Sequence, residues 1–429
     1  MIEYTERKGT GCIKWDGLEE TFGSDGLLPL WVADMDFRVD RHITDAVGEY
    51  LHHGVFGYEA VPESYYDAFM DWEREEHGLV IEREWIRYSP GVVSGFNFAL
   101  QLLSGLGDAV IVNTPVYYPF LRAAENNGRR LICSELINRG GRYYIDFEDF
   151  EQKIISSAVK VFIMCSPHNP VGRVWKKEEI RRILDICKRH GVFVISDEIH
   201  QDIVMSGHKH VPSATVGDEA GAYDDILVTL TAATKTFNLA ALQNSIVIIP
   251  DEGLRARWDR FAEGIRINSG NAFGYIAVQA AYEEGRPWFD ELLGVIEGNY
   301  KYLRERLEAE LPDVRVVDHE GTYLLWVDLS AYMDRIISKA AKAEVRDPDA
   351  EEGATTKTTA VSAANTAETA VAAMQHFMED ECGIAVDYGA WFGGGEYAGC
   401  IRVNLATCRE NIEIAADRII SALKNNICV

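Results

Sequence analysis

The sequence lacks the features of a membrane-spanning, nucleic-acid-binding or disulfide-stabilised protein. No apolar run approaches the roughly eighteen residues of a membrane span, and residues 1–11 hold no apolar signal segment. The eight cysteines show no CxxC spacing, which is typical of free thiols in a reducing compartment. Basic residues are scarce, with 42 Lys and Arg against 68 Asp and Glu, which argues against a nucleic-acid-binding surface. We therefore predict a cytoplasmic protein that binds neither membrane nor nucleic acid.

One long segment lacks aromatic residues. None occurs from Met333 to His376, and the centre of this segment is rich in Ala, Thr and Glu. Such a composition cannot supply a core of its own. We expect an insertion at about residues 338–372, either mobile or forming a solvated helix in its Ala-rich half.

The remaining chain has the length and composition of a large α/β enzyme. At 429 residues and 47% hydrophobic content, it can form two or three domains with sizeable cores. Apolar runs predict strands at Ala109–Asn113, Arg130–Leu136, Val159–Cys165, Val192–Ser196, Ile226–Leu230 and Ser245–Ile249. Helical patterns lie between them at Ser94–Leu103, Val116–Asn126 and Lys177–His190. This alternation indicates a mainly parallel sheet covered by helices on both faces.

Three polar side chains follow three of these apolar runs. Asn169 lies in a turn fixed by two prolines and a glycine, Asp197 ends the next run, and Lys235 follows a third. Taken singly, each has an ordinary interpretation as a turn asparagine, a helix N-cap or a solvated lysine. In an open α/β sheet, however, ligands bind outside the carboxyl ends of the strands. An amide, a carboxylate and a lysine in this order form the set that pyridoxal phosphate requires.

At these residues the chain resembles the fold-type I pyridoxal-phosphate enzymes of the class I/II aminotransferase superfamily. Its motifs resemble the carbon-sulfur lyase branch, whose best-known members are cystathionine beta-lyases. The motifs are PLWVADMDF (Pro29 to Phe37), GVFGY (Gly54 to Tyr58), YSPGVV (Tyr88 to Val93), PVYYPF (Pro115 to Phe120), PHNPVGRVW (Pro167 to Trp175), SDEIH (Ser196 to His200), TKTFNLAAL (ending at Leu242) and GTYLLWVDL (Gly321 to Leu329). The match runs from Pro29 to Arg409, apart from the insertion.

The resemblance implies an α/β fold of the aspartate aminotransferase type. Its mainly parallel seven-stranded sheet would lie between helices, beside a smaller α/β C-terminal domain. Residues 1–44 would form an N-terminal arm and part of the small domain, 45–285 the large pyridoxal-phosphate-binding domain, and 286–429 the small domain.

The resemblance also implies roles for individual residues. Lys235 would form the Schiff base and act as the base, Asp197 would pair with the pyridine nitrogen, and Asn169 would contact the phenolic oxygen. Tyr117 would stack on the ring as the second catalytic residue, and Arg402 would hold the substrate carboxylate. His200 would either tune the cofactor or lie behind it. The phosphate ligands would be the amides of Val92 and Val93, the hydroxyls of Thr231 and Thr234, and Tyr58 of a neighbouring subunit.

No metal role is expected, because His208 and His210 flank a lysine without a coherent set of further ligands. The implied protein is a homodimer with shared active sites that takes a small amino acid as substrate. Its implied reaction is β-elimination of a thiol from cystathionine or a related cysteine conjugate, giving pyruvate and ammonia. Ala232 and Gln243 favour the lyase branch, because the aspartate aminotransferase pattern has a serine and an arginine there. An aminotransferase, or a lyase relative with a regulatory protein-binding role, remains an alternative.

Overall fold

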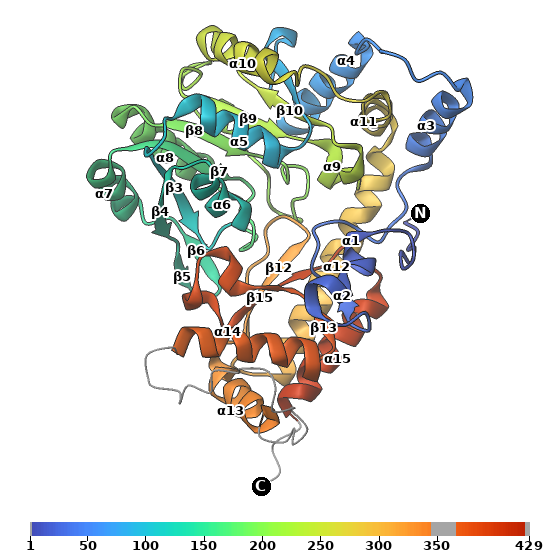
Figure 1. The fold of residues 1–429 in the computed structure, drawn as a ribbon, viewed down its shortest axis with the longest axis vertical. Helices are drawn as coiled ribbons and strands as arrows, with labels where there is room; N and C mark the ends of the chain where they lie inside the picture. The colour runs from blue at the N-terminus through green and yellow to red at the C-terminus, as the bar shows by residue number, and fades with distance from the viewer. Residues whose placement is uncertain (1, 345–365, 425–429) are drawn as a thin grey trace, which may run out of the picture. The chain divides into compact units, whose positions relative to one another are not determined.

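The computed structural model describes residues 2–344 and 366–424 (Figure 1). Two compact units are present. The first unit comprises Met1–Thr5, Asp34–Glu297 and Asp318–Tyr323, and the second comprises Glu6–Ala33, Gly298–Val317 and Leu324–Val429. This division does not test the domain boundaries expected from the sequence, which remain a prediction. None of the described helices is both long enough and apolar enough to cross a membrane.

A seven-stranded sheet forms the centre of the first unit. Its strands are β2 (Ile86–Ser89), β3 (Ala109–Thr114), β4 (Arg130–Glu135), β7 (Val159–Cys165), β8 (Phe193–Asp197), β9 (Leu227–Thr231) and β10 (Ser245–Ile248). They lie in the order β2-β10-β9-β8-β7-β3-β4. The last five run parallel to one another, and β10 runs antiparallel to both of its neighbours, β2 and β9. The predicted mainly parallel α/β fold is therefore confirmed, and all six predicted strands are present.

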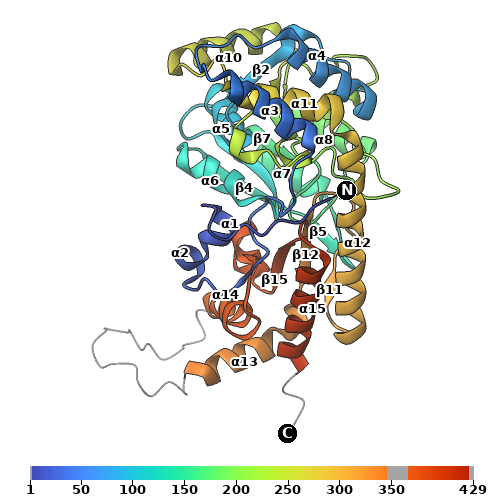
Figure 2. The ribbon, with the colours of Figure 1, turned by 90° about the vertical axis from the view of Figure 1, so that its right-hand side faces the viewer.

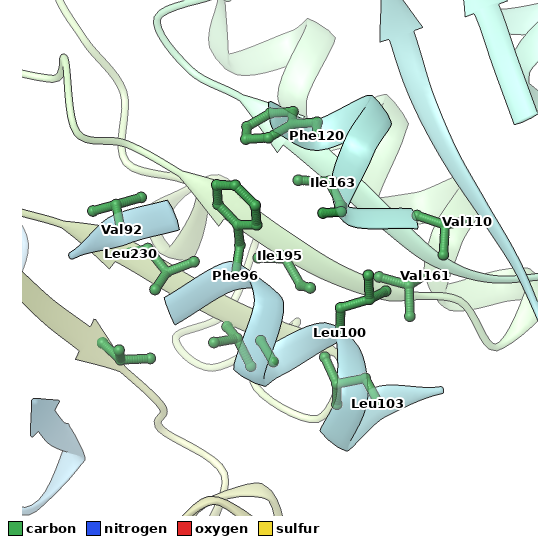
Figure 3. Close-up of a cluster of buried hydrophobic side chains, with 14 of the residues drawn as sticks. Val92, Phe96, Leu100, Leu103, Val110, Phe120, Val161, Ile163, Ile195 and Leu230 are labelled. Atoms are coloured by element: carbon green, nitrogen blue, oxygen red, sulfur yellow. The ribbon is translucent and has the colours of Figure 1, made fainter. Parts of the chain in front are cut away.

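Helices cover both faces of this sheet. On one face, α5 (Val92–Leu103), α6 (Tyr118–Asn126) and α10 (Glu252–Ile265) share one buried apolar cluster with the strands (Figure 3). Val161 of β7 belongs to that cluster, whereas its neighbour Phe162 packs against Phe150 of α7 (Phe147–Ser157), with 5.0 Å between ring centroids. Since successive strand residues point to opposite faces, α7 covers the other face. Both faces are buried, which explains the uninterrupted apolar runs of the sequence.

The first unit contains further helices and one hairpin. The helices are α3 (Arg41–His53), α4 (Glu63–Trp72), α8 (Lys177–His190), α9 (Ala233–Thr236), α11 (Ala272–Glu284) and the N-terminal part of α12 (Arg286–Glu310), up to Glu297. A π-helix, η1 (Glu73–His77), continues directly from α4, and β5 (Ile137–Arg139) pairs with β6 (Arg142–Tyr144). Side-chain caps fix several helix starts; Asp146, for example, accepts from two amides of α7.

An antiparallel sheet organises the second unit. Its strands lie in the order β11 (Arg315–Val316), β12 (Leu324–Asp328), β15 (Cys400–Asn404) and β14 (Asp387–Tyr388). A separate parallel pair joins β1 (Leu28–Pro29) to β13 (Ile384–Ala385). The helices are α1 (Ile13–Asp16), α2 (Leu18–Phe22), α13 (Met333–Glu344), α14 (Thr366–His376) and α15 (Arg409–Lys424), of which α13 packs against α14 (Figure 2). The ends of the predicted insertion lie in α13 and α14, and its residues 345–365 lie outside the described residues.

Candidate active site

Asn169, Asp197 and Lys235 lie at the carboxyl ends of three adjacent strands. In the parallel register, Cys165 of β7 lies beside Asp197 of β8, which lies beside Leu230 of β9. Asn169 and Asp197 are buried, Lys235 is half-buried, and the charge of Lys235 acts on the Asp197 carboxyl. The structure thus brings the three predicted groups together at one edge of the sheet.

The Asp197 carboxyl is held in an environment that disfavours its own negative charge. Burial raises its pKa to about 7, although the Ile199 amide, which donates to Oδ1 at 3.1 Å, and the Lys235 charge both oppose this shift. Asp197 is therefore both a turn aspartate and a candidate ligand. A cationic partner would favour its charged form, as expected of a carboxylate that pairs with a pyridinium nitrogen.

The loop of Asn169 is joined to the loop of Tyr117. The Tyr117 amide donates to the Asn169 carbonyl at 3.0 Å, and the His168 ring bonds the Pro115 carbonyl at 2.9 Å. Tyr117 is half-buried, and its ring lies edge-on to Phe120 with 5.9 Å between centroids. These contacts place the candidate stacking residue next to the candidate amide ligand.

The N-terminus of α5 lies near the strand end that precedes Lys235. Val92, the first residue of α5, belongs to the same buried cluster as Leu230 and Ala232 (Figure 3). The helix comes this close because residue 95 is glycine: a Cβ there would lie 2.4 Å from Leu230 Cδ2. The first amides of a helix have no partner within it, so this N-terminus can accept an anion.

The other predicted phosphate ligands divide into two groups. Val93 is partly exposed in the first turn of α5, while Thr231 is buried at the end of β9 and Thr234 is half-buried in α9. Tyr58, in contrast, is fully exposed in the segment between α3 and α4. Its exposure is compatible with a contact outside its own chain.

The predicted histidines occupy different environments. His200 is buried, and its ring lies edge-on to that of Tyr323 with 5.8 Å between centroids. His208 is exposed, whereas His210 is buried and bonds Glu198 with 2.9 Å between Nε2 and Oε2. Among the residues that the structure describes, no group of three His, Cys, Asp or Glu side chains could hold a metal ion.

Arg402 lies in the second unit and is buried there on β15. Its Nη2 donates to the carboxylate of Asp387, directly opposite on β14, and to the carbonyl of Trp31 at 3.2 Å. Its guanidinium also lies 5.0 Å from the centroid of the Phe392 ring. Burial raises the pKa of Asp387 to about 6, although the Arg402 charge opposes this. A buried arginine needs an anionic partner, and Asp387 provides one.

Sequence reasoning missed a set of buried polar residues beside the site. Glu198 belongs to the same motif as Asp197, and Asp202 follows that motif by two residues, so their positions were visible in the sequence, but their partners were not. Glu73 and His77 come from the charged run EREEH of η1, which has the composition of a solvated helix end, yet both of these side chains are buried. No sequence signal distinguishes that run from a surface segment.

Comparison with known proteins places this site in context. Residues 52–419 match the family model described as aminotransferase class I and II. The cystathionine beta-lyase PatB of Bacillus subtilis (strain 168) is 44% identical over 327 residues, which cover 76% of this chain and 84% of PatB. The solved PLP-bound C-S lyase of Staphylococcus hominis has a TM-score of 0.84 at 31% identity, covering 98% of this chain and 97% of that one. Cystalysin of Treponema denticola, whose structure contains pyridoxal 5'-phosphate, has a TM-score of 0.85 at 31% identity over 99% of both chains.

Proposed function

Because the chain belongs to the class I and II aminotransferase family, we propose that it is a pyridoxal-phosphate-dependent carbon-sulfur β-lyase. Its substrate is cystathionine or a related cysteine conjugate, which reacts with water to give a thiol, pyruvate and ammonia. The meeting of Asn169, Asp197 and Lys235 at one edge of the sheet carries this proposal. The names of PatB and of the lyases with solved structures support the same reaction.

The residues present fit pyridoxal phosphate. A buried carboxyl whose pKa is raised to about 7 suits a cationic ring nitrogen, and the α5 N-terminus with Thr231 and Thr234 suits a phosphate. When bound, the cofactor withdraws electrons from the substrate Cα. Lys235 would hold the cofactor covalently, Asn169 would donate to its phenolic oxygen, and Tyr117 would stack on its ring.

The protein's own groups then account for the proton transfers. The Lys235 amine, once free, would take the Cα proton as general base. It would then return a proton to the sulfur that leaves Cβ. Asp197 would favour the protonated form of the ring nitrogen. Arg402 binds the substrate carboxylate, since its planar guanidinium matches a carboxylate in bidentate geometry and Asp387 fixes its orientation.

The protein acts as a homodimer in this proposal, and Tyr58 reaches the phosphate bound by the partner copy. Support comes from Leu51, Val55, Phe56 and Tyr58, whose side chains are more than half exposed in one stretch of a single chain. A second copy of the chain would cover such a run of apolar side chains. Sedimentation velocity should give a dimer. Tyr58→Phe should weaken cofactor binding without dissociating that dimer. A monomeric active enzyme would overturn the shared-site arrangement.

The cytoplasm is the proposed location. The described cysteines form no disulfide, and burial raises the pKa of Cys382 to about 12, so that its thiolate is disfavoured. Cysteines without disulfides are typical of proteins in a reducing compartment.

Keto acid release from cystathionine tests the reaction. A lyase releases pyruvate in the absence of any amino acceptor, whereas an aminotransferase on the same scaffold needs an acceptor keto acid. Lys235→Ala serves as the blank for uncatalysed release. Turnover that strictly requires the acceptor would replace the lyase proposal by the aminotransferase.

A further inference from the structure

A buried carboxylate, Asp202, lies behind the helix that carries Lys235. It accepts three hydrogen bonds, from His77 Nε2 at 2.6 Å, Trp72 Nε1 at 3.0 Å and Thr236 Oγ1 at 2.5 Å. The side chains of His77 and Asp202 are only 6% and 4% exposed. A buried carboxylate with this many donors is held in one position.

The third of these donors belongs to the residue that follows Lys235. Helix α9 spans only Ala233–Thr236, a single turn that its own backbone bonds cannot stabilise in isolation. Thr236 is fully buried, and the next side chain, Phe237, packs edge-on against Trp72 with 5.5 Å between ring centroids. The position of the Lys235 backbone therefore depends on contacts that its neighbour makes.

The charges around Asp202 favour its ionised form. Burial alone would raise its pKa, but the hydrogen bond and charge of His77 hold this pKa below its ordinary value. Burial alone would likewise lower the pKa of His77, yet Asp202, Glu73 and Glu198 together raise it to about 9. Burial raises the pKa of Glu73 to about 8, although the charge of His77 opposes this shift. Asp202 and His77 thus form a buried ion pair beside a carboxyl whose charge is disfavoured by burial.

We propose that Asp202, backed by His77, is a positioning residue that fixes the Lys235 amine through its hydrogen bond with Thr236. One short segment then serves the cofactor twice, since Asp197 begins it and Asp202 ends it five residues later. This proposal rests on Lys235 being the residue that holds the cofactor. Borohydride labelling of Lys235 distinguishes a failure of that premise from a failure of the positioning role.

Thr236→Val removes the hydroxyl at nearly constant volume, and Thr236→Ser keeps it. Thr229→Val makes the same change at another buried threonine, on β9. The holoenzymes would be compared by borohydride reduction followed by peptide mass spectrometry, by pH titration of the cofactor absorbance, and by kcat and KM. We expect Thr236→Val to lower kcat by about tenfold or more and KM by little, because it removes an oriented, charge-assisted bond.

The midpoint of the absorbance titration should also move in Thr236→Val by about one pH unit, return in Thr236→Ser, and stay unchanged in Thr229→Val. Equal behaviour of Thr236→Val and Thr229→Val, with Lys235 labelled in both, would overturn the positioning role alone. Borohydride labelling of a residue other than Lys235 in the unmodified protein would overturn the proposed function itself.

Discussion

Replacing Asp197 by asparagine tests whether this position is built for a cationic partner. The substitution keeps the size of the side chain, and the amide oxygen can still accept the bond from the Ile199 amide. Only the negative charge is lost. In the absence of cofactor, burial raises the pKa of Asp197 from its ordinary value of 3.8 to about 7.

The size of the expected stability change follows from the difference between the pKa of Asp197 in the folded and in the unfolded chain. As the pH rises from 3.8, the unfolded chain releases the Asp197 proton first, so the free energy of unfolding falls until about pH 7 and then stays level. A difference of about three pKa units corresponds to about 4 kcal/mol. Asp197→Asn should therefore raise the free energy of unfolding of the cofactor-free protein by about 4 kcal/mol at pH 8 and by about 2 kcal/mol at pH 5.

The assay is urea unfolding at both pH values, with and without pyridoxal phosphate. The cofactor should stabilise the unmodified protein more than Asp197→Asn, because only the carboxylate gains from a cationic ring nitrogen. Asp202→Asn is the matched control. Its carboxyl is equally buried, but His77 holds its pKa below the ordinary value, so this change should lower the free energy of unfolding by about 3 kcal/mol or more at pH 8. A lower stability of cofactor-free Asp197→Asn at pH 8 would refute the reasoning.

Three further predictions concern single residues. Lys235→Ala should lose the near-visible absorbance of the bound cofactor together with keto acid release, and persistence of that absorbance would exclude Lys235 as the attachment point. Arg402→Lys should raise KM for the amino acid by about tenfold or more, because an ammonium lacks the bidentate fork of a guanidinium. Arg266→Lys, at the exposed end of α10, should leave KM unchanged, and equal KM values for the two variants in steady-state assays would exclude Arg402 from substrate binding. Gly95→Ala should lower the free energy of unfolding, measured in urea, by about 1–3 kcal/mol, because its Cβ would lie 2.4 Å from a β9 side chain. Gly264→Ala in α10, where a Cβ would have nothing within 4 Å, should not lower it, and equal effects of the two changes would contradict the close approach of α5.

The strand ends were predictable because two local signals agree with a simple rule of topology. Uninterrupted apolar runs predict parallel strands buried on both faces, and the carboxyl ends of parallel strands share one edge. Asn169, Asp197 and Lys235 each follow such a run directly, so their meeting required no knowledge of loop geometry. The α5 N-terminus was predictable for the same reason, since Gly91 precedes a clear helical pattern.

The partners of buried charges were not predictable, because they are distant in sequence. Asp202 bonds a residue 125 positions earlier and another 34 positions later. The π-helix that buries His77 has the composition of a solvated segment. Asp387 could not be predicted as the partner of Arg402, because its strand, β14, is two residues long and gives no periodic signal. In the structure it lies directly opposite Arg402.

The two aspartates of one segment show how burial separates a binding role from a structural one. Asp197 and Asp202 are equally removed from water, yet burial raises the pKa of the first, while His77 holds the pKa of the second below its ordinary value. A carboxylate that already accepts hydrogen bonds from the fold is stabilised little further by a ligand. A carboxyl whose charged form is disfavoured by burial is stabilised strongly by a bound cation. When neighbouring acids are shifted in opposite directions, their environments identify their roles. We therefore expect Asp197 to pair with the cofactor and Asp202 to hold the surrounding structure in place.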